Sequence, residues 1–314
     1  MKAIAISEFG GIEQLHKMEL EKPKIDANEV LVKVNYTAVN PVDWKIREGY
    51  LKDRLPHKFP IVLGWDASGV VSEVGKNVKS FKVGDEVFAY CRKPTVQWGT
   101  YAEYIALDAS SVAHKPKNIN FAQAAAIPLV GLTAWQALFD AAKLKKGDTI
   151  LIHAGAGGVG SLAIQFAKHI GAHVLTTASP ANHDYVINLG ADSALDYTKD
   201  YVGQVKQMYP KGIDVIFDCI GGKTAHESIP LLKSQGYFVS IVEKMKAEDA
   251  AQHDIQSSYV FVSPNGKELA EIATLISENK VKVPNIIEMT LDDVAKAHGM
   301  SQTHHVNGKI VLKV

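Results

Sequence analysis

The spacing of apolar residues changes about a third of the way along the chain. Up to about Phe121, short runs such as Glu29–Tyr36, Ile61–Val74 and Asp85–Ala89 alternate apolar and polar residues, and Gly, Pro, Asn and Asp separate the runs. Alternation of this kind predicts strands of an antiparallel barrel or sandwich. Beyond Phe121, short continuous apolar runs take turns with segments of helical spacing. We therefore expect a β-rich first part and a β-α-β middle part.

The middle part predicts a doubly wound α/β domain. Its strands are expected at His173–Thr177, Ser193–Asp196, Ile213–Cys219 and Gly236–Val242, with helical segments between them. Continuous apolar strands are typical of a parallel sheet that helices cover on both faces.

A glycine-rich loop begins this domain. The apolar run Thr149–Ile152 leads into G-x-G-x-x-G at 155–160 and then directly into a helical pattern. Gly155 permits a tight turn, Gly157 lets the backbone approach phosphates, and Gly160 lets the helix pack closely. Glycine-rich turns also close many hairpins, but a position between strand and helix favours a dinucleotide site, where phosphates meet the helix N-terminus. The expected cofactor residues here are Gly155, Gly157, Gly158, Val159 and Gly160.

The last strand sets the domain organisation. Gly308–Val314 reads as a strand that returns to the first domain. We expect a β-rich domain at 1–121, a nucleotide-binding domain at 122–282, and a return to the first domain at 283–314. A cleft between two domains is the expected ligand site.

Composition removes several classes of protein. The 314 residues include 34 Lys and Arg against 34 Asp and Glu, which argues against a nucleic-acid partner. No apolar run is long enough to span a bilayer, and Met1–Ile6 alternates like a strand rather than a signal peptide. Cys91 and Cys219 fall in different predicted regions, so we expect no disulfide, a reducing compartment and a cytoplasmic location.

Several segments, taken together and in order, resemble one family. They are Val39–Gly49, Gly64–Val71, Gly84–Phe88, Gly99–Tyr104, Ala125–Ala134, the glycine loop and Gly308–Leu312. Over essentially its whole length the chain resembles the zinc-independent, zeta-crystallin-like quinone oxidoreductases of the medium-chain dehydrogenase/reductase superfamily. The resemblance implies a GroES-like barrel with a Rossmann domain, and NADPH-dependent two-electron reduction.

The residues also argue against a catalytic metal. Zinc-dependent relatives carry a cysteine where this chain has Asn40 to Asp43, and Gly-His-Glu where it has Gly64-Trp65-Asp66. A structural zinc site would need four clustered cysteines. The pair His304-His305 has no spaced partner, so we interpret it as a solvated turn. Without a Lewis acid for alcohol oxidation, reduction of a quinone or an α,β-unsaturated carbonyl by hydride is the expected reaction.

Four residues are candidates for catalysis. By resemblance, Asn40 and Asp43 lie beside the nicotinamide, and the Asn40 amide could donate to a developing oxyanion. Alternatively, Asn40 forms a turn before Pro41. Asp43 either orients Asn40 or Lys45, or serves as an acid at a helix N-terminus. Lys45 and Tyr50 are the available proton donors, although water can also protonate an enolate.

Cofactor choice depends on the end of the second strand. NAD-specific domains place an acidic residue about 20 residues after the first glycine, but Leu175–His183 holds no carboxylate. Ser179 and Asn182 can bind a 2′-phosphate instead, which predicts NADPH.

Other expected cofactor contacts come from the resemblance alone. They are Tyr197, Thr133 near the nicotinamide ribose, and the backbone of Ile220, Gly221, Phe261 and Val262. For Thr133 the alternative is simple helix capping, and for the last four it is ordinary strand packing.

The sequence also predicts an oligomeric state and leaves two alternative functions to consider. Ser258–Val262 is a short apolar strand, and an exposed edge of this kind needs a partner, so we expect a homodimer through edge pairing. An NADPH-binding sensor or crystallin-like protein with little turnover would keep the same glycine loop. A methyltransferase could also use such a loop, but the barrel segments argue against it.

Overall fold

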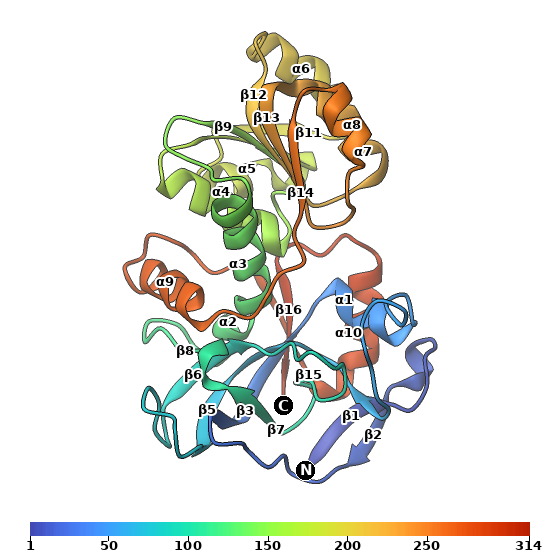
Figure 1. Cartoon of the computed structure of the whole chain (residues 1–314), viewed down its shortest axis with the longest axis vertical. Coiled ribbons are helices and arrows are strands. Elements are labelled where there is room, and N and C mark those ends of the chain that lie inside the picture. The colour runs from blue at the N-terminus through green and yellow to red at the C-terminus, as the bar shows by residue number, and fades with distance from the viewer. The chain divides into compact units, whose positions relative to one another are not determined.

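The computed structural model describes all 314 residues and divides into two compact units (Figure 1). Unit 1 comprises Met1–Leu129, Ser263–Asn279 and Val283–Val314. Unit 2 comprises Val130–Val262 and Lys280–Lys282. Unit 1 contains two sheets, and unit 2 is built around one.

Unit 1 is rich in β-structure, as its alternating pattern predicted. Its strands are β1 (Lys2–Ile6), β2 (His16–Glu19), β3 (Glu29–Val39), β4 (Ile61–Val62), β5 (Asp66–Val74), β6 (Glu86–Tyr90), β7 (Tyr104–Asp108), β8 (Val112–His114), β15 (Ile286–Thr290) and β16 (Lys309–Lys313). The larger sheet has the order β15-β16-β3-β5-β6-β8, with β7 paired to β3, and the smaller has the order β2-β1-β4. Alternate residues of β3, among them Val30, Val32 and Val34, pack into one apolar core because successive side chains of a strand point to opposite faces.

The C-terminal strand returns to this unit, as expected. β16 pairs antiparallel with β3 and parallel with β15. Because of this pairing, Lys309 near the end of the chain lies beside the end of β3, where its Nζ donates to the carbonyl of Val39 at 3.0 Å.

Four helices complete unit 1: α1 (Pro41–Arg47), α2 (Phe121–Ala125), α9 (Gly266–Ser277) and α10 (Val294–Gln302). Asn265 caps α9 by accepting from the backbone N–H groups of Lys267 and Glu268. α1 and α10 pack together.

Unit 2 is the doubly wound domain that the sequence predicted. Its strands are β9 (Thr149–Ile152), β10 (His173–Ala178), β11 (Ser193–Asp196), β12 (Ile213–Asp218), β13 (Leu232–Ser240) and β14 (Gln256–Tyr259). They form one parallel sheet in the order β11-β10-β9-β12-β13-β14. The strand order reverses at β9, and in such sheets ligands bind outside the carboxyl ends of the strands at this point.

Four helices of unit 2 lie where the periodicity predicted helical segments. They are α4 (Gly158–His169), α5 (His183–Asn188), α6 (Tyr201–Met208) and α7 (Gly222–Ser228). The fifth, α8 (Ala247–Gln252), lies in a polar stretch for which no helix was predicted. α3 (Pro128–Trp135) carries the chain from unit 1 into unit 2 and continues into a π-helix at Gln136–Ala141. None of the helices is both long and apolar enough to cross a bilayer.

The unit boundaries differ from the expected ones. Unit 2 begins at Val130, whereas the predicted middle domain begins at 122, and α9 lies in unit 1 although the prediction placed it in the middle domain. α9 packs on β8, and the side chain of Asn118 donates to the carbonyl of Ile276 at 2.9 Å. These contacts join segments more than 150 residues apart, which periodicity along the chain cannot reveal.

Candidate functional site

The loop after β9 has the shape of a phosphate-binding turn. Gly155 lies against β10, where a Cβ would come within 2.1 Å of Thr176 Oγ1, and a Cβ on Gly160 would come within 2.3 Å of the Ala154 carbonyl oxygen. The left-handed residue of the turn is Ala154, at φ 55°, rather than a glycine. Gly155 and Gly160 are therefore explained by close packing within unit 2.

Gly157 differs from its two neighbours in the motif. A Cβ there would meet only the Ala154 carbonyl oxygen, at 3.4 Å, so the fold itself leaves this space open. Gly157 is also the N-cap of α4, whose 12 residues begin at Gly158. The first N–H groups of a helix lack intrahelical partners and favour an anion. The residues present fit the pyrophosphate of a dinucleotide.

The end of β10 carries the two residues expected at a 2′-phosphate. Asn182 Nδ2 donates to Ser179 Oγ at 3.1 Å, and both side chains are half-buried. Tyr197 follows β11 and is half exposed. The first carboxylate after this strand is Asp184, within α5.

The remaining expected cofactor residues lie at several places in unit 2. Ile220 is half exposed in the turn after β12, and Gly221 follows it with a positive φ of 78°. Phe261 is half-buried after β14, whereas Val262 and Thr133 are buried.

In unit 1, Asn40 belongs to a buried polar cluster. Its amide nitrogen donates to Asp66 Oδ2 at 2.8 Å, and its amide oxygen accepts from Lys309 Nζ. Asp66 Oδ1 accepts from the backbone N–H of Leu129 at 2.6 Å. Burial raises the pKa of Asp66 and lowers the pKa of Lys309, and the attraction between the two charges opposes both shifts. The amide of Asn40 is thus fixed from both ends, with one N–H left for another acceptor.

Asp43 occupies the third position of α1 and lies in the core. Its Oδ2 accepts from the backbone N–H of Asn40 at 2.7 Å and from the hydroxyl of Tyr101 at 3.2 Å, while Oδ1 has no partner. Burial raises the pKa of Asp43 to about 7. Of the two contacts expected for Asp43, the structure contains the one to Asn40.

A chain of hydrogen bonds extends from Asp43 to α10. Tyr101 Oη lies 3.1 Å from His298 Nε2, and His298 Nδ1 lies 3.0 Å from Arg47 Nη1. Because a guanidinium only donates, Nδ1 is the accepting nitrogen and Nε2 carries the proton. Burial, and secondarily the Arg47 charge, lower the pKa of His298 to about 3.

The sequence interpretation missed four members of this cluster. Asp66 was considered only as a missing zinc ligand, and Lys309, Tyr101 and His298 were given no role. An ionisable residue within an apolar run, as at Asp66 and Lys309, was the available signal, because such a group needs a buried partner.

The two candidate proton donors are in different surroundings. Lys45 is half-buried, its Nζ lies 5.6 Å from the centre of the Trp44 ring, and burial lowers its pKa. Tyr50 is 71% exposed and its ring meets that of Trp44 edge to face. Neither side chain has a hydrogen bond to Asp43.

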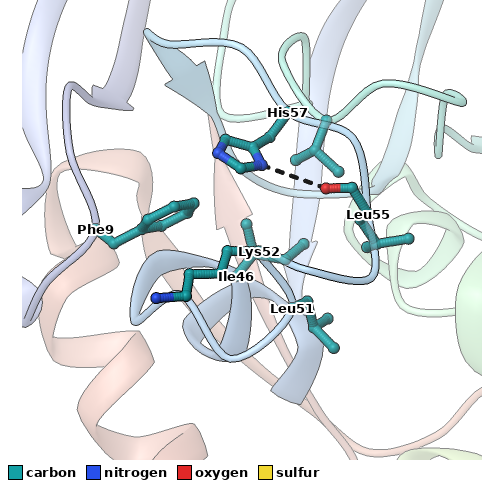
Figure 2. A pocket seen from close by; sticks show the side chains of 7 residues that line it. Phe9, Ile46, Leu51, Lys52, Leu55 and His57 are labelled. Carbon is teal, nitrogen blue, oxygen red and sulfur yellow. Dashed lines mark hydrogen bonds between the residues drawn. The ribbon is translucent and has the colours of Figure 1, made fainter.

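A small apolar cavity lies between α1 and the segment that follows it. Figure 2 shows its lining of Phe9, Ile46, Leu51, Lys52, Leu55 and His57, joined by Val96. Its volume is about 10 Å³, which is room for about one water molecule. His57 Nδ1 lies 3.3 Å from the Leu55 carbonyl oxygen, as the dashed line in Figure 2 marks.

The potential metal ligands are scattered. No group of three or more His, Cys, Asp or Glu side chains is placed to hold an ion. Cys91 and Cys219 are both free thiols, and His304-His305 is an exposed segment after α10.

Comparison with known proteins agrees with this architecture. Residues 26–117 match the alcohol dehydrogenase GroES-like domain, and residues 189–312 match a family described as zinc-binding dehydrogenase. The chain is 37% identical to an NADPH-dependent alkenal/one oxidoreductase of Arabidopsis thaliana, over 99% of this chain and 79% of that protein.

Solved structures extend the likeness to the whole fold. A quinone oxidoreductase from Coxiella burnetii is 36% identical with a TM-score of 0.89, over 100% of this chain and 99% of that one. The Escherichia coli quinone oxidoreductase, solved with NADPH, is 28% identical with a TM-score of 0.89 over 100% of both chains. The chain therefore belongs to the medium-chain dehydrogenase/reductase family, in its quinone oxidoreductase group.

Proposed function

We propose that this protein is an NADPH-dependent oxidoreductase that reduces quinones or α,β-unsaturated carbonyl compounds by hydride transfer. The observation that carries the proposal is the loop at 155–160, where the fold leaves open the space beside Gly157 at the start of α4. The names of the Arabidopsis, Coxiella and Escherichia coli relatives support the reaction class.

Different residues of the chain would bind different parts of NADPH. The glycine loop holds the pyrophosphate, and Ser179 with Asn182 holds the 2′-phosphate. Thr133, Tyr197, Ile220, Gly221, Phe261 and Val262 complete the proposed cofactor contacts. When bound, NADPH supplies the hydride, and the protein supplies orientation and polar groups.

Asn40 is the proposed donor to the oxyanion that forms during reduction. Asp66 and Lys309 hold its amide in one orientation, which leaves one N–H for the substrate. A donor that is fixed in advance stabilises developing charge without reorganisation. Asp43 accepts a hydrogen bond from the backbone N–H of Asn40 and so fixes its position. Lys45 or Tyr50 would deliver the proton that completes the reaction.

We propose that the reaction needs no zinc, although one matching family model carries a zinc-binding description. The positions that ligate zinc in zinc-dependent relatives hold Asn40, Asp43, Trp65 and Asp66, and the two carboxylates already accept protein hydrogen bonds. We further propose a cytoplasmic location, supported by two free cysteines that lie in different units.

A steady-state assay tests the function. Purified protein is given NADPH with a panel of quinones, enals and enones, and simple alcohols with NADP⁺ serve as the comparison. We expect turnover with at least one quinone or conjugated carbonyl, little with alcohols, and unchanged rates after dialysis against a chelator. Tight NADPH binding without turnover would favour the sensor or crystallin-like alternative, and inactivation reversed by zinc would contradict the zinc-free mechanism.

A further inference from the structure

A single buried carboxylate holds together several turns at the carboxyl edge of the sheet in unit 2. Asp218 is the last residue of β12 and is fully buried. Its Oδ1 accepts from the backbone N–H groups of Ile220 and Gly221, at 3.1 and 3.0 Å, and lies 3.0 Å from His153 Nδ1. His153 directly follows β9 and immediately precedes the phosphate-binding turn.

The other oxygen of this carboxylate reaches a third turn. Asp218 Oδ2 accepts from the hydroxyl of Ser240, the last residue of β13, at 2.7 Å. Ser240 Oγ in turn accepts from the backbone N–H groups of Val242 and Glu243, at 3.1 and 3.2 Å. The segments that follow β9, β12 and β13 are therefore connected through Asp218.

The other ring nitrogen of His153 meets a buried hydroxyl. His153 Nε2 lies 3.0 Å from Ser228 Oγ, which also lies 2.8 Å from the Thr224 carbonyl oxygen and 2.8 Å from the Tyr201 hydroxyl. The ring of His153 is therefore held at both nitrogens, by Asp218 on one side and by Ser228 on the other.

The Nδ1 atom of His153 donates to Asp218. Asp218 already accepts from two backbone N–H groups and from Ser240, so it acts as an acceptor on both oxygens. Burial acts to raise the pKa of Asp218, but the hydrogen bonds from His153, Gly221 and Ser240 outweigh it and hold the pKa below its usual value. An ionised carboxylate can only accept, which leaves His153 Nδ1 as a donor.

We propose that the buried pair of Asp218 and His153, with Ser228 against the far side of the ring, is the positioning element for the turns that bind NADPH. The proposal rests on the proposed function, because the phosphate-binding turn starts at the residue after His153. Turns that are held in place before binding lose less conformational freedom when the cofactor is bound. Neither His153 nor Asp218 needs to touch NADPH for this effect.

The order Ser228, His153 and Asp218 also resembles a hydrolytic triad. All three side chains are completely buried, however, so Ser228 is closed to a substrate. A nucleophilic serine must give its proton to the histidine and reach a substrate, so the arrangement supports positioning and not hydrolysis.

Few other ionisable groups act on the pair. Tyr201 on α6 faces His153, with ring centres 6.4 Å apart. Cys219 adjoins Asp218, and burial raises the pKa of its thiol. Glu227 on α7 acts on Tyr201. Asp218 is the carboxylate in contact with His153.

Cofactor titration tests the positioning role, with Asp214→Asn as the matched control. Asp214 lies on the same strand at the opposite edge of the sheet, where it accepts from the backbone N–H of Thr149 at 2.8 Å. We expect Asp218→Asn to raise the Kd for NADPH about ten- to a hundredfold, from lost hydrogen bonds to a charged group, and the control to change it less than about threefold. The kcat at saturating NADPH should stay within about threefold in both variants, because neither residue touches the reacting atoms. Equal Kd values for the two variants would refute the role.

Ser240→Ala covers the case in which Asp218→Asn does not fold. It removes the hydroxyl that joins Asp218 to the backbone N–H groups after β13 and leaves the contact between Asp218 and His153 in place. We expect the Kd for NADPH to rise above that of the Asp214→Asn control; a Kd equal to that of the control would overturn the positioning role. A wild-type protein that binds no NADPH would contradict the proposed function instead.

Discussion

The side-chain amide of Asn40 donates a 2.8 Å hydrogen bond to the carboxylate of Asp66, and both residues are buried. Asn40 lies just before α1 and Asp66 begins β5, so the bond joins the helix to the sheet of unit 1. Lys309 binds the other end of the same amide. This arrangement fixes the proposed oxyanion donor before a substrate arrives.

Asn40→Ala should lower kcat by about ten- to a thousandfold, the effect of losing one preorganised donor. The Kd for NADPH should stay nearly unchanged. The substitution also leaves Asp66 and Lys309 with fewer partners, so the free energy of unfolding should fall by about 1–3 kcal/mol. Measuring kcat well below the melting temperature of the variant separates the loss of catalysis from the loss of stability. Asn118→Ala is a control elsewhere in unit 1. A wild-type kcat would remove Asn40 from the mechanism.

Asp43→Asn should flatten the dependence of stability on pH. Burial raises the pKa of Asp43 from 3.8 to about 7, so the folded state binds this proton more tightly than the unfolded chain. The group therefore favours folding at low pH, and its contribution is lost as the pH rises from about 4 to about 7. The melting temperature should therefore decline less over this pH range in the variant than in the wild type.

Asp108→Asn is the control of opposite sign. Hydrogen bonds from Ser110 hold the pKa of Asp108 below its usual value. The contribution of Asp108 to the free energy of unfolding is therefore present at pH above the usual pKa and is lost as the pH falls. An unchanged pH profile in Asp43→Asn would contradict the raised pKa.

Ser179→Asp should reverse or abolish a preference for NADPH over NADH, because a carboxylate at the end of β10 would repel the 2′-phosphate. The ratio of the two dissociation constants is the measurement. Ser277→Asp adds the same charge to α9 of unit 1 and should leave the ratio unchanged. Equal affinity of the wild type for both cofactors would disprove the assignment.

Gly157→Val should abolish NADPH binding while the protein stays folded. The nearest protein atom to a Cβ at this position is 3.4 Å away, so the side chain would occupy the space proposed for the pyrophosphate. The Kd should rise by about a hundredfold or more, which corresponds to about 3 kcal/mol. Gly299→Val, in α10, also places a side chain in open space and should bind NADPH normally. Normal binding by Gly157→Val would place the phosphates elsewhere.

We predict a homodimer that forms through the edge of the unit 2 sheet. β14 is an edge strand, although it ends at Tyr259 and is shorter than the predicted Ser258–Val262. Light scattering at micromolar concentration should give twice the 34.1 kDa mass of the chain. Val260→Lys, next to the edge, should shift the mass toward the monomer, and Ile187→Lys on α5 should not. A wild-type monomer would rule out the dimer.

The sequence by itself determined most elements of unit 2 and its class of ligand. β11 spans Ser193–Asp196, as expected, and the helix after the glycine loop begins at Gly158. These features are local, because hydrophobic period and glycine spacing act over a few residues. The family resemblance was legible for the same reason, since it depended on short motifs.

Only the tertiary structure decided which buried polar groups meet. Lys309 contacts Asn40 across 269 positions of sequence, and Asp218 contacts His153 across 65. α9 likewise joined unit 1 through contacts with β8 and with Asn118. Such pairings depend on strand order and on how distant segments pack, and no periodicity along the chain encodes them. A charged residue within an apolar run indicates that a buried partner is needed. Only the fold determines which residue that partner is.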